Sequence, residues 1–117
     1  MHVIVIGGGI GGLAAALSLH AAGIEVDVYE SVAELKPLGV GINVLPHAVR
    51  ELTELGLAER LAANAIATEA LVYTNRFGQE IWREPRGQLA GYKWPQFSIH
   101  RGLLQMLLLE AVIERLG

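Results

Sequence analysis

The hydrophobic pattern of the first thirty residues predicts a strand, a helix and a second strand. An apolar run over residues 2–6 (HVIVI) is typical of a buried parallel strand. A helical run over 13–22 follows and ends at Gly23, and 25–29 (EVDVY) predicts the second strand. These segments together predict one βαβ unit.

The pattern changes after residue 30, where alternating β-forming residues predict an antiparallel hairpin and apolar residues at helical spacing predict further helices. The predicted elements are, in order, a loop over 31–42, helices over 48–55 and 58–63, hairpin strands over 70–76 and 80–83 with a turn at 77–79, a loop over 85–95, a strand over 97–100 and a helix over 102–116. The leucines of the last helix are expected to lie in the core, namely Leu103, Leu104, Leu107 and Leu108.

The expected fold class is α/β, a Rossmann-like βαβ unit with an inserted antiparallel β-hairpin and an incomplete parallel sheet. Because the two N-terminal strands need further strands to cover their edges, we expect the protein to be longer than this chain.

The glycines between the first strand and the first helix match G-x-G-x-x-G at Gly7, Gly9 and Gly12, with Gly11 inside the motif. Gly7 permits a sharp turn, Gly9 permits close approach of the backbone to a pyrophosphate, and Gly12 permits close packing of the helix on the sheet. The helix N-terminus offers unpaired N–H groups to the same pyrophosphate. A glycine-rich turn that only packs a helix on a sheet is the alternative.

Glu30 follows the second strand, 23 positions after Gly7, where a carboxylate can accept hydrogen bonds from an adenosine ribose. A solvated acid at a strand end is the alternative. The position of Glu30 nevertheless supports a dinucleotide site.

The elements after Glu30 indicate which dinucleotide is bound. A domain that binds NAD would normally continue with alternating strands and helices, so the antiparallel insertion favours FAD over NAD. The βαβ unit is therefore expected to be FAD-binding. We expect 1–117 to be the N-terminal part of an FAD-binding domain, with about 70–100 in the inserted, substrate-side segment.

Composition narrows the class of protein. Of the 117 residues, 52% are hydrophobic and 18% charged, which argues against disorder. The net charge of −3 gives no reason to expect nucleic acid, and no apolar stretch predicts a membrane span or stable membrane association. There is no cysteine, and Met1 leads directly into the first strand, so we expect a cytoplasmic protein. No histidine has metal-ligand spacing, and no metal site is expected.

Three stretches resemble the N-terminal third of single-component (group A) FAD-dependent aromatic monooxygenases, the family of the p-hydroxybenzoate and salicylate hydroxylases. They are GGGIGGLAAALSLHAAGIEVDVYE, PLGVGINVLPHAVRELTELGL and SIHRGLLQMLL. The stretches PLGVGIN, WREPRG and WPQFSIHRG look most similar to the branch that acts on 5-methylphenazine-1-carboxylate.

The resemblance implies that Gly7, Gly9, Gly11 and Gly12 cradle the FAD pyrophosphate and that Glu30 holds the ribose. It implies that Arg101 contacts FAD and that the loop over 39–42, which contains Gly39 and Gly41, lies near the flavin ring. In such enzymes NADH or NADPH reduces the flavin, and molecular oxygen adds to give a C4a-hydroperoxide that hydroxylates a small aromatic substrate, here a phenazine. The later motifs of the family are absent, so the chain alone is expected to be inactive, and no catalytic residue or oligomeric state is predicted.

Several alternatives stay open at this point. The chain would also suit another FAD-dependent oxidoreductase, or a truncated, non-catalytic dinucleotide-binding module. Arg101 has the alternative role of a helix residue paired with a surface acid. His100, beside it, is a candidate for orienting a loop near the flavin.

Overall fold

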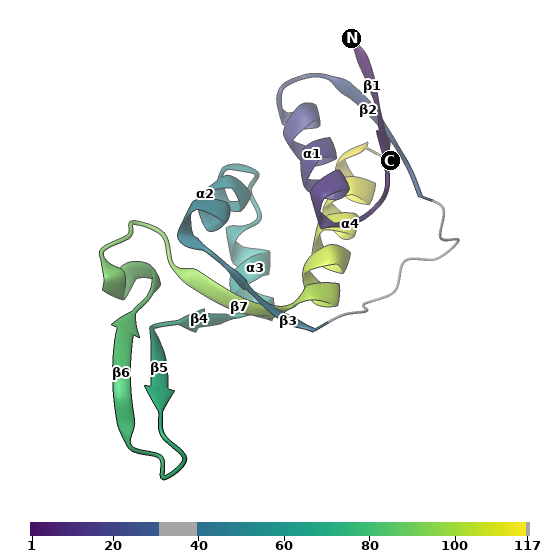
Figure 1. The fold of residues 1–117 in the computed structure, drawn as a ribbon. Helices are drawn as coiled ribbons and strands as arrows, with labels where there is room; N and C mark the ends of the chain where they lie inside the picture. The colour runs from purple at the N-terminus through teal and green to yellow at the C-terminus, as the bar shows by residue number, and fades with distance from the viewer. Residues whose placement is uncertain (31–39, 117) are drawn as a thin grey trace. The chain divides into compact units, whose positions relative to one another are not determined.

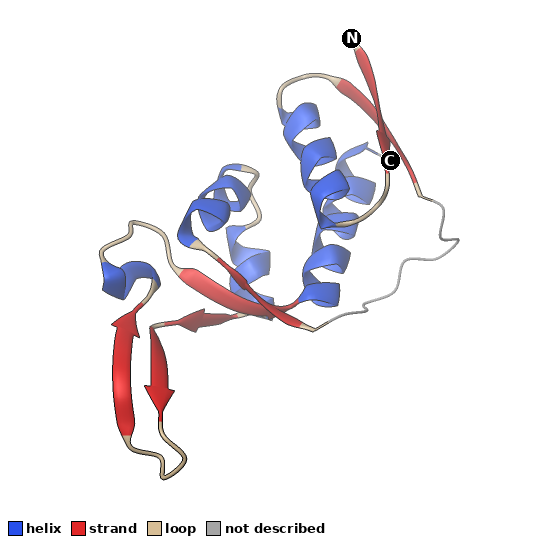
Figure 2. Ribbon diagram, in the orientation of Figure 1, coloured by secondary structure: helices blue, strands red, loops and turns tan. Residues whose placement is uncertain are grey.

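The computed structural model describes residues 1–30 and 40–116, and the chain forms two compact units (Figures 1 and 2). The first unit consists of 1–41 and 100–117, and the second of 42–99. The elements in chain order are β1 (His2–Ile6), α1 (Ile10–Ala21), β2 (Glu25–Tyr29), β3 (Gly41–Val44), α2 (Pro46–Glu54), α3 (Ala58–Asn64), β4 (Ile66–Thr68), β5 (Ala70–Thr74), β6 (Glu80–Pro85), the 3-10 helix η1 (Gly87–Ala90), β7 (Gln96–His100) and α4 (Arg101–Leu116).

The first unit contains the predicted βαβ arrangement. Strands β1 and β2 pair in parallel, with His2 opposite Glu25 and Ile6 opposite Tyr29. Helix α1 connects the two strands and packs against both of them and against α4, beside which it lies in Figure 1. This parallel βαβ unit, together with the antiparallel strand pairs of the second unit, confirms the predicted α/β class.

Burial of apolar side chains between α1 and α4 forms the core of the first unit. Leu13, Ala16 and Leu17 recur at helical spacing on α1, and each is at most 1% exposed. Full burial of one leucine stabilises a fold by about 1.5–3 kcal/mol. Helix α4 is buried at Leu104, Leu107 and Leu108, as predicted, and at Ala111 and Val112. The expectation for Leu103 is wrong: it is 44% exposed, because it lies off this buried face.

The prediction that β1 is a buried strand is correct for one face only. The valines of β1 and β2 are half-buried, whereas Ile4, Ile6 and Tyr29 are 57%, 80% and 57% exposed. Successive side chains of a strand point to opposite faces of the sheet, so α1 covers only the valine side.

The second unit is built on a three-stranded sheet in the order β3-β7-β4, with β4 antiparallel to β7. The central strand β7 is the most buried, with Phe97 and Ile99 in the core. Apolar residues of α2, α3 and the turn between them complete this core, namely Val49, Leu52, Leu57 and Leu61. The sequence prediction missed both outer strands, because β4 has three residues and β3 begins at a glycine in what looked like a loop.

The predicted antiparallel hairpin is formed by β5 and β6, but its turn begins earlier than expected. The Asn75 side-chain oxygen accepts hydrogen bonds from the N–H groups of Phe77 and Gln79. Asn75 and Arg76 therefore belong to the turn and not to the strand. Asparagine favours turns because its side chain bonds to the backbone two residues on.

The starts of α1, α2 and α4 were predicted too late, whereas α3 begins at Ala58 as predicted, and the loop expected over 85–95 contains η1. Helix α1 begins at Ile10 and not at Leu13, because glycines in its first turn weakened the helical pattern. Helix α2 begins at Pro46, since proline suits the first turn of a helix.

Gly12 provides a test of the packing between α1 and β1. A β-carbon at Gly12 would overlap the Gly7 carbonyl oxygen and lie 3.4 Å from Val5 Cγ1. We expect Gly12→Ala to lower the free energy of unfolding by about 1–3 kcal/mol, the usual cost of overpacking, in urea denaturation without ligand. Gly11→Ala is the matched control, because a β-carbon there meets nothing within 4 Å. Equal stability of the two variants would contradict this account.

Candidate functional site

The glycine-rich loop between β1 and α1 is held at its first residue by the sheet. The Gly7 N–H donates to the Tyr29 carbonyl oxygen at 2.6 Å, which extends the parallel pairing of β1 and β2 by one bond. Gly7 has φ +105°, a left-handed conformation that other residues rarely adopt. This bond and this conformation turn the chain sharply away from the strand.

Glu30 fixes the next peptide group. The Gly8 N–H donates to the Glu30 carboxylate, which brings the end of β2 to the glycine loop. The peptide unit that contains the Gly8 N–H also contains the Gly7 carbonyl group. The Gly7 carbonyl oxygen occupies the position that a side chain at Gly12 would need. The structure thus brings Gly7, Gly12 and Glu30 together at the end of β1.

Within the described residues, the N-terminus of α1 has neither a side-chain cap nor an acid in its own first turn. Gly9 is the N-cap residue with extended backbone (φ −74°, ψ 179°), no side chain caps the helix, and its first turn contains no acid. Unpaired N–H groups at a helix N-terminus carry about half a positive charge and attract anions. This end of α1 therefore has the electrostatics of an anion site.

Gly9 and Gly11 are glycines that no contact with the described residues requires. A β-carbon at either position would meet nothing within 4 Å, and neither residue has positive φ. The space that side chains would fill stays open beside the N-terminus of α1. Such a cradle fits the pyrophosphate of a dinucleotide such as FAD, which needs close approach of the backbone.

Arg101 is the first residue of α4, and its backbone N–H donates to the Val40 carbonyl oxygen at 2.8 Å. This bond places Gly41, the next residue after Val40, beside the start of α4. The Arg101 side chain is exposed and forms no ion pair with a described residue, so the alternative of a pairing with a surface acid finds no support. A cation in the first turn also opposes the helix dipole, which an anionic ligand would relieve.

His100 has a structural role in the described chain. Its Nδ1 accepts a hydrogen bond from the Gly102 N–H at 3.1 Å, which satisfies one unpaired donor at the N-terminus of α4. The Gly39 part of the loop predicted near the flavin lies outside the described residues.

Sequence reasoning missed Gln105, a buried polar residue of α4. It is 9% exposed, and its Nε2 donates to the Gly8 carbonyl oxygen at 2.9 Å. The feature of the sequence that could have identified Gln105 is its position as a polar residue among the apolar residues Leu104, Leu107 and Leu108. Arg101 lies four residues before Gln105, so the two are neighbours on one side of α4, and Gln105 contacts the glycine loop from that side.

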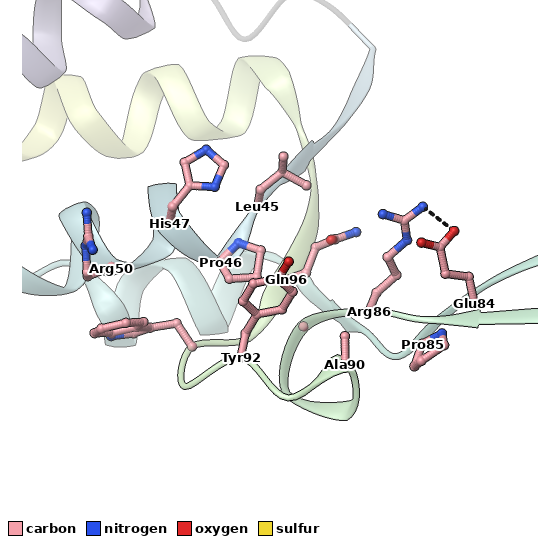
Figure 3. Close-up of a pocket in the computed structure, with 12 residues that line it drawn as sticks. Leu45, Pro46, His47, Arg50, Glu84, Pro85, Arg86, Ala90, Tyr92 and Gln96 are labelled. Carbon is pink, nitrogen blue, oxygen red and sulfur yellow. Dashed lines mark hydrogen bonds and ion pairs between the residues drawn. The ribbon is translucent and has the colours of Figure 1, made fainter.

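A separate cavity of about 490 Å³ lies within the second unit, between the N-terminus of α2 and the segment after β6 (Figure 3). Tyr92 and Trp94 contribute aromatic walls, and Arg50 and Arg86 contribute cations. Both arginines are already paired: Arg86 Nη2 lies 3.1 Å from a Glu84 carboxylate oxygen, and Arg50 Nη2 lies 3.0 Å from one of Glu51. The cavity therefore offers little uncompensated charge to a ligand.

In the described part of the chain, no three metal-ligating side chains gather, and no helix is long and apolar enough to cross a membrane. In the described part of the first unit, the candidate ligand-binding groups are the N-terminus of α1, the Glu30 carboxylate and the exposed Arg101 side chain.

A family of FAD-binding domains matches residues 1–109, and the chain belongs to this family. The predicted preference for FAD over NAD is thereby confirmed. The resemblance to aromatic hydroxylases is also confirmed, since relatives of the chain and solved structures similar to it are enzymes of this kind.

Phenazine 1,6-dicarboxylic acid hydroxylase PhzS of Lysobacter antibioticus is 58% identical over 116 residues, which cover 98% of this chain and 28% of that protein. 3-Hydroxybenzoate 6-hydroxylase of Polaromonas naphthalenivorans is 36% identical over 117 residues, covering 97% and 29%. The structure of Klebsiella pneumoniae HpxO complexed with FAD and uric acid matches with a TM-score of 0.79 at 31% identity, covering 95% and 28%. The chain thus spans somewhat more than a quarter of the length of these relatives.

Gly9 allows the cofactor hypothesis to be tested separately from folding. Because a β-carbon at Gly9 meets no described protein atom within 4 Å and its φ is −74°, we expect Gly9→Ala to lower the free energy of unfolding by at most about 1 kcal/mol, the difference between glycine and alanine as N-cap residues. The added methyl group would fill the cradle, so the affinity for FAD should fall roughly tenfold or more, which corresponds to about 1.4 kcal/mol. Fluorescence titration with FAD measures the loss. An unchanged Kd would show that no ligand approaches Gly9 closely.

Proposed function

We propose that this chain forms the part of a flavoprotein hydroxylase that holds the adenosine diphosphate half of FAD. The observation that carries the proposal is the uncapped N-terminus of α1, with open space at Gly9 and Gly11 and the Glu30 carboxylate at the same loop. A glycine loop that served only to pack a helix would need Gly7 and Gly12 but not the other two.

The proposed roles follow from these positions. The N–H groups at the start of α1 bind the pyrophosphate, with Gly7 and Gly12 shaping the loop and Gly9 and Gly11 leaving room. Glu30 accepts hydrogen bonds from the adenosine ribose, in exchange for part of its bonding to Gly8. Arg101 supplies a cation to FAD, a role that suits its lack of an ion pair to any described residue, and Gly41 permits approach to the flavin ring.

For the whole protein we propose hydroxylation of a small aromatic substrate, with NADH or NADPH as reductant and molecular oxygen as co-substrate. The similarity to PhzS favours a phenazine carboxylic acid as substrate. Bound FAD supplies the redox and oxygen chemistry, and the residues described here bind and orient it. We further propose that 70–100 belongs to an inserted antiparallel, substrate-side segment and that the protein is cytoplasmic, in keeping with its lack of cysteine.

The carboxylate of Glu30 is the most direct test of this function. We expect Glu30→Ala to weaken FAD binding by roughly 10- to 100-fold, because a hydrogen bond to a charged group contributes about 1.5–3 kcal/mol. Isothermal titration of the chain with FAD, ADP and FMN measures the effect. ADP should lose affinity in parallel with FAD, whereas FMN, which lacks the adenosine, should not respond to the substitution.

Glu25→Ala is the matched control, since it removes a carboxylate from the same strand at an exposed position. It should bind FAD as the unaltered chain does. Equal FAD affinity of the Glu30 and Glu25 variants would refute the assignment of Glu30 to the ribose.

A further inference from the structure

Gln105 connects the last helix to the glycine loop across 97 residues of sequence. Its Nε2 donates to the Gly8 carbonyl oxygen at 2.9 Å, and this bond is buried. A glutamine that is 9% exposed within an apolar helix face needs such a partner, because burial without one is costly. The bond therefore fixes both the side chain of Gln105 and the carbonyl group of Gly8.

The direction of the Gly8 carbonyl group determines the direction of the Gly9 N–H group. The Gly8 carbonyl and the Gly9 N–H belong to one peptide unit, which is planar and trans, as no cis peptide occurs among the described residues. In a trans peptide the C=O and N–H bonds point in opposite directions. With the carbonyl directed at Gln105, the Gly9 N–H is directed to the opposite side.

The peptide units on both sides of this one are fixed as well. The preceding unit is held by the bond from the Gly8 N–H to Glu30, and the following one by the bond from the Leu13 N–H to the Gly9 carbonyl, at 2.9 Å. The Gly9 N–H, in contrast, has no acceptor among the described residues. It lies beside the open space at Gly9 and next to the uncapped N-terminus of α1.

We infer that Gln105 is a positioning residue that directs the Gly9 N–H toward a phosphate oxygen of the bound dinucleotide. This inference rests on the proposed FAD function and adds a residue to it that the glycine motif does not contain. Gln105 touches no ligand in this arrangement. It acts by holding one peptide unit in the orientation in which its N–H donates to an anion.

Gln105→Met removes the donor while it nearly preserves the length and volume of the side chain. We expect the Kd for ADP and for FAD to rise roughly tenfold, the effect of about one misdirected hydrogen bond to a charged group. The Kd for adenosine, which lacks the phosphates, should change by less than about twofold, well below the effect of one hydrogen bond. Isothermal titration of the unaltered chain and the variant with these three ligands gives the comparison.

Leu104→Met is the matched control, because it alters a neighbouring buried position of α4 with little change in volume. It should leave the binding of all three ligands unchanged. If Gln105→Met bound ADP as tightly as the control, or lost adenosine and ADP equally, the positioning role would be overturned. If the unaltered chain bound neither ADP nor FAD, the proposed function itself would fail.

Amide hydrogen exchange of the unaltered chain tests the geometry without any substitution. The Gly8 N–H should be protected by its bond to Glu30, and the Gly9 N–H should exchange rapidly in the free chain and slow down with ADP. A Gly9 N–H that is already protected in the free chain would overturn the inference, whether or not Gln105→Met folds.

Discussion

The close approach of α1 to the end of β1 is the constraint on which the first unit depends. The Gly7 carbonyl oxygen occupies the space that any side chain at Gly12 would need, so the helix can begin directly above the strand only with glycine at that position. This approach lets Leu13 and Leu17 reach the core, and it brings the N-terminus of α1 to the end of the sheet beside Glu30. Packing and binding geometry thus have the same origin in this unit.

Each peptide unit of the glycine loop is held by a different part of the first unit. The β2 backbone holds the Gly7 N–H, Glu30 holds the Gly8 N–H, and α4 holds the Gly8 carbonyl through Gln105. A loop of glycines has high conformational entropy and would not keep one shape by itself. The polar contacts from β2 and α4 replace the rigidity that side chains would otherwise provide, and they do so without filling the space above the loop.

The sequence was sufficient to predict the βαβ unit, because three features there agree: an apolar strand, glycines at fixed spacing and an acid after the second strand. It also predicted the hairpin of β5 and β6, whose alternating pattern is local. It failed for β3 and β4, which are short and take their strand conformation from pairing with the central strand β7. Long-range pairing of this kind leaves little trace in local propensity.

The difference between local pattern and long-range contact also explains which candidate site residues could be predicted from the sequence. Gly7, Gly9, Gly12 and Glu30 belong to a motif with fixed local spacing, whereas Gln105 reaches the loop only because α4 packs on α1. The structure also divides the glycines of the motif into two kinds: Gly7 and Gly12 are required by the fold, through positive φ and through close packing, and Gly9 and Gly11 are not. Because glycine inside a helix costs stability relative to alanine, Gly11, which the described fold does not need, points to a ligand that does, and the open space at Gly9 points the same way.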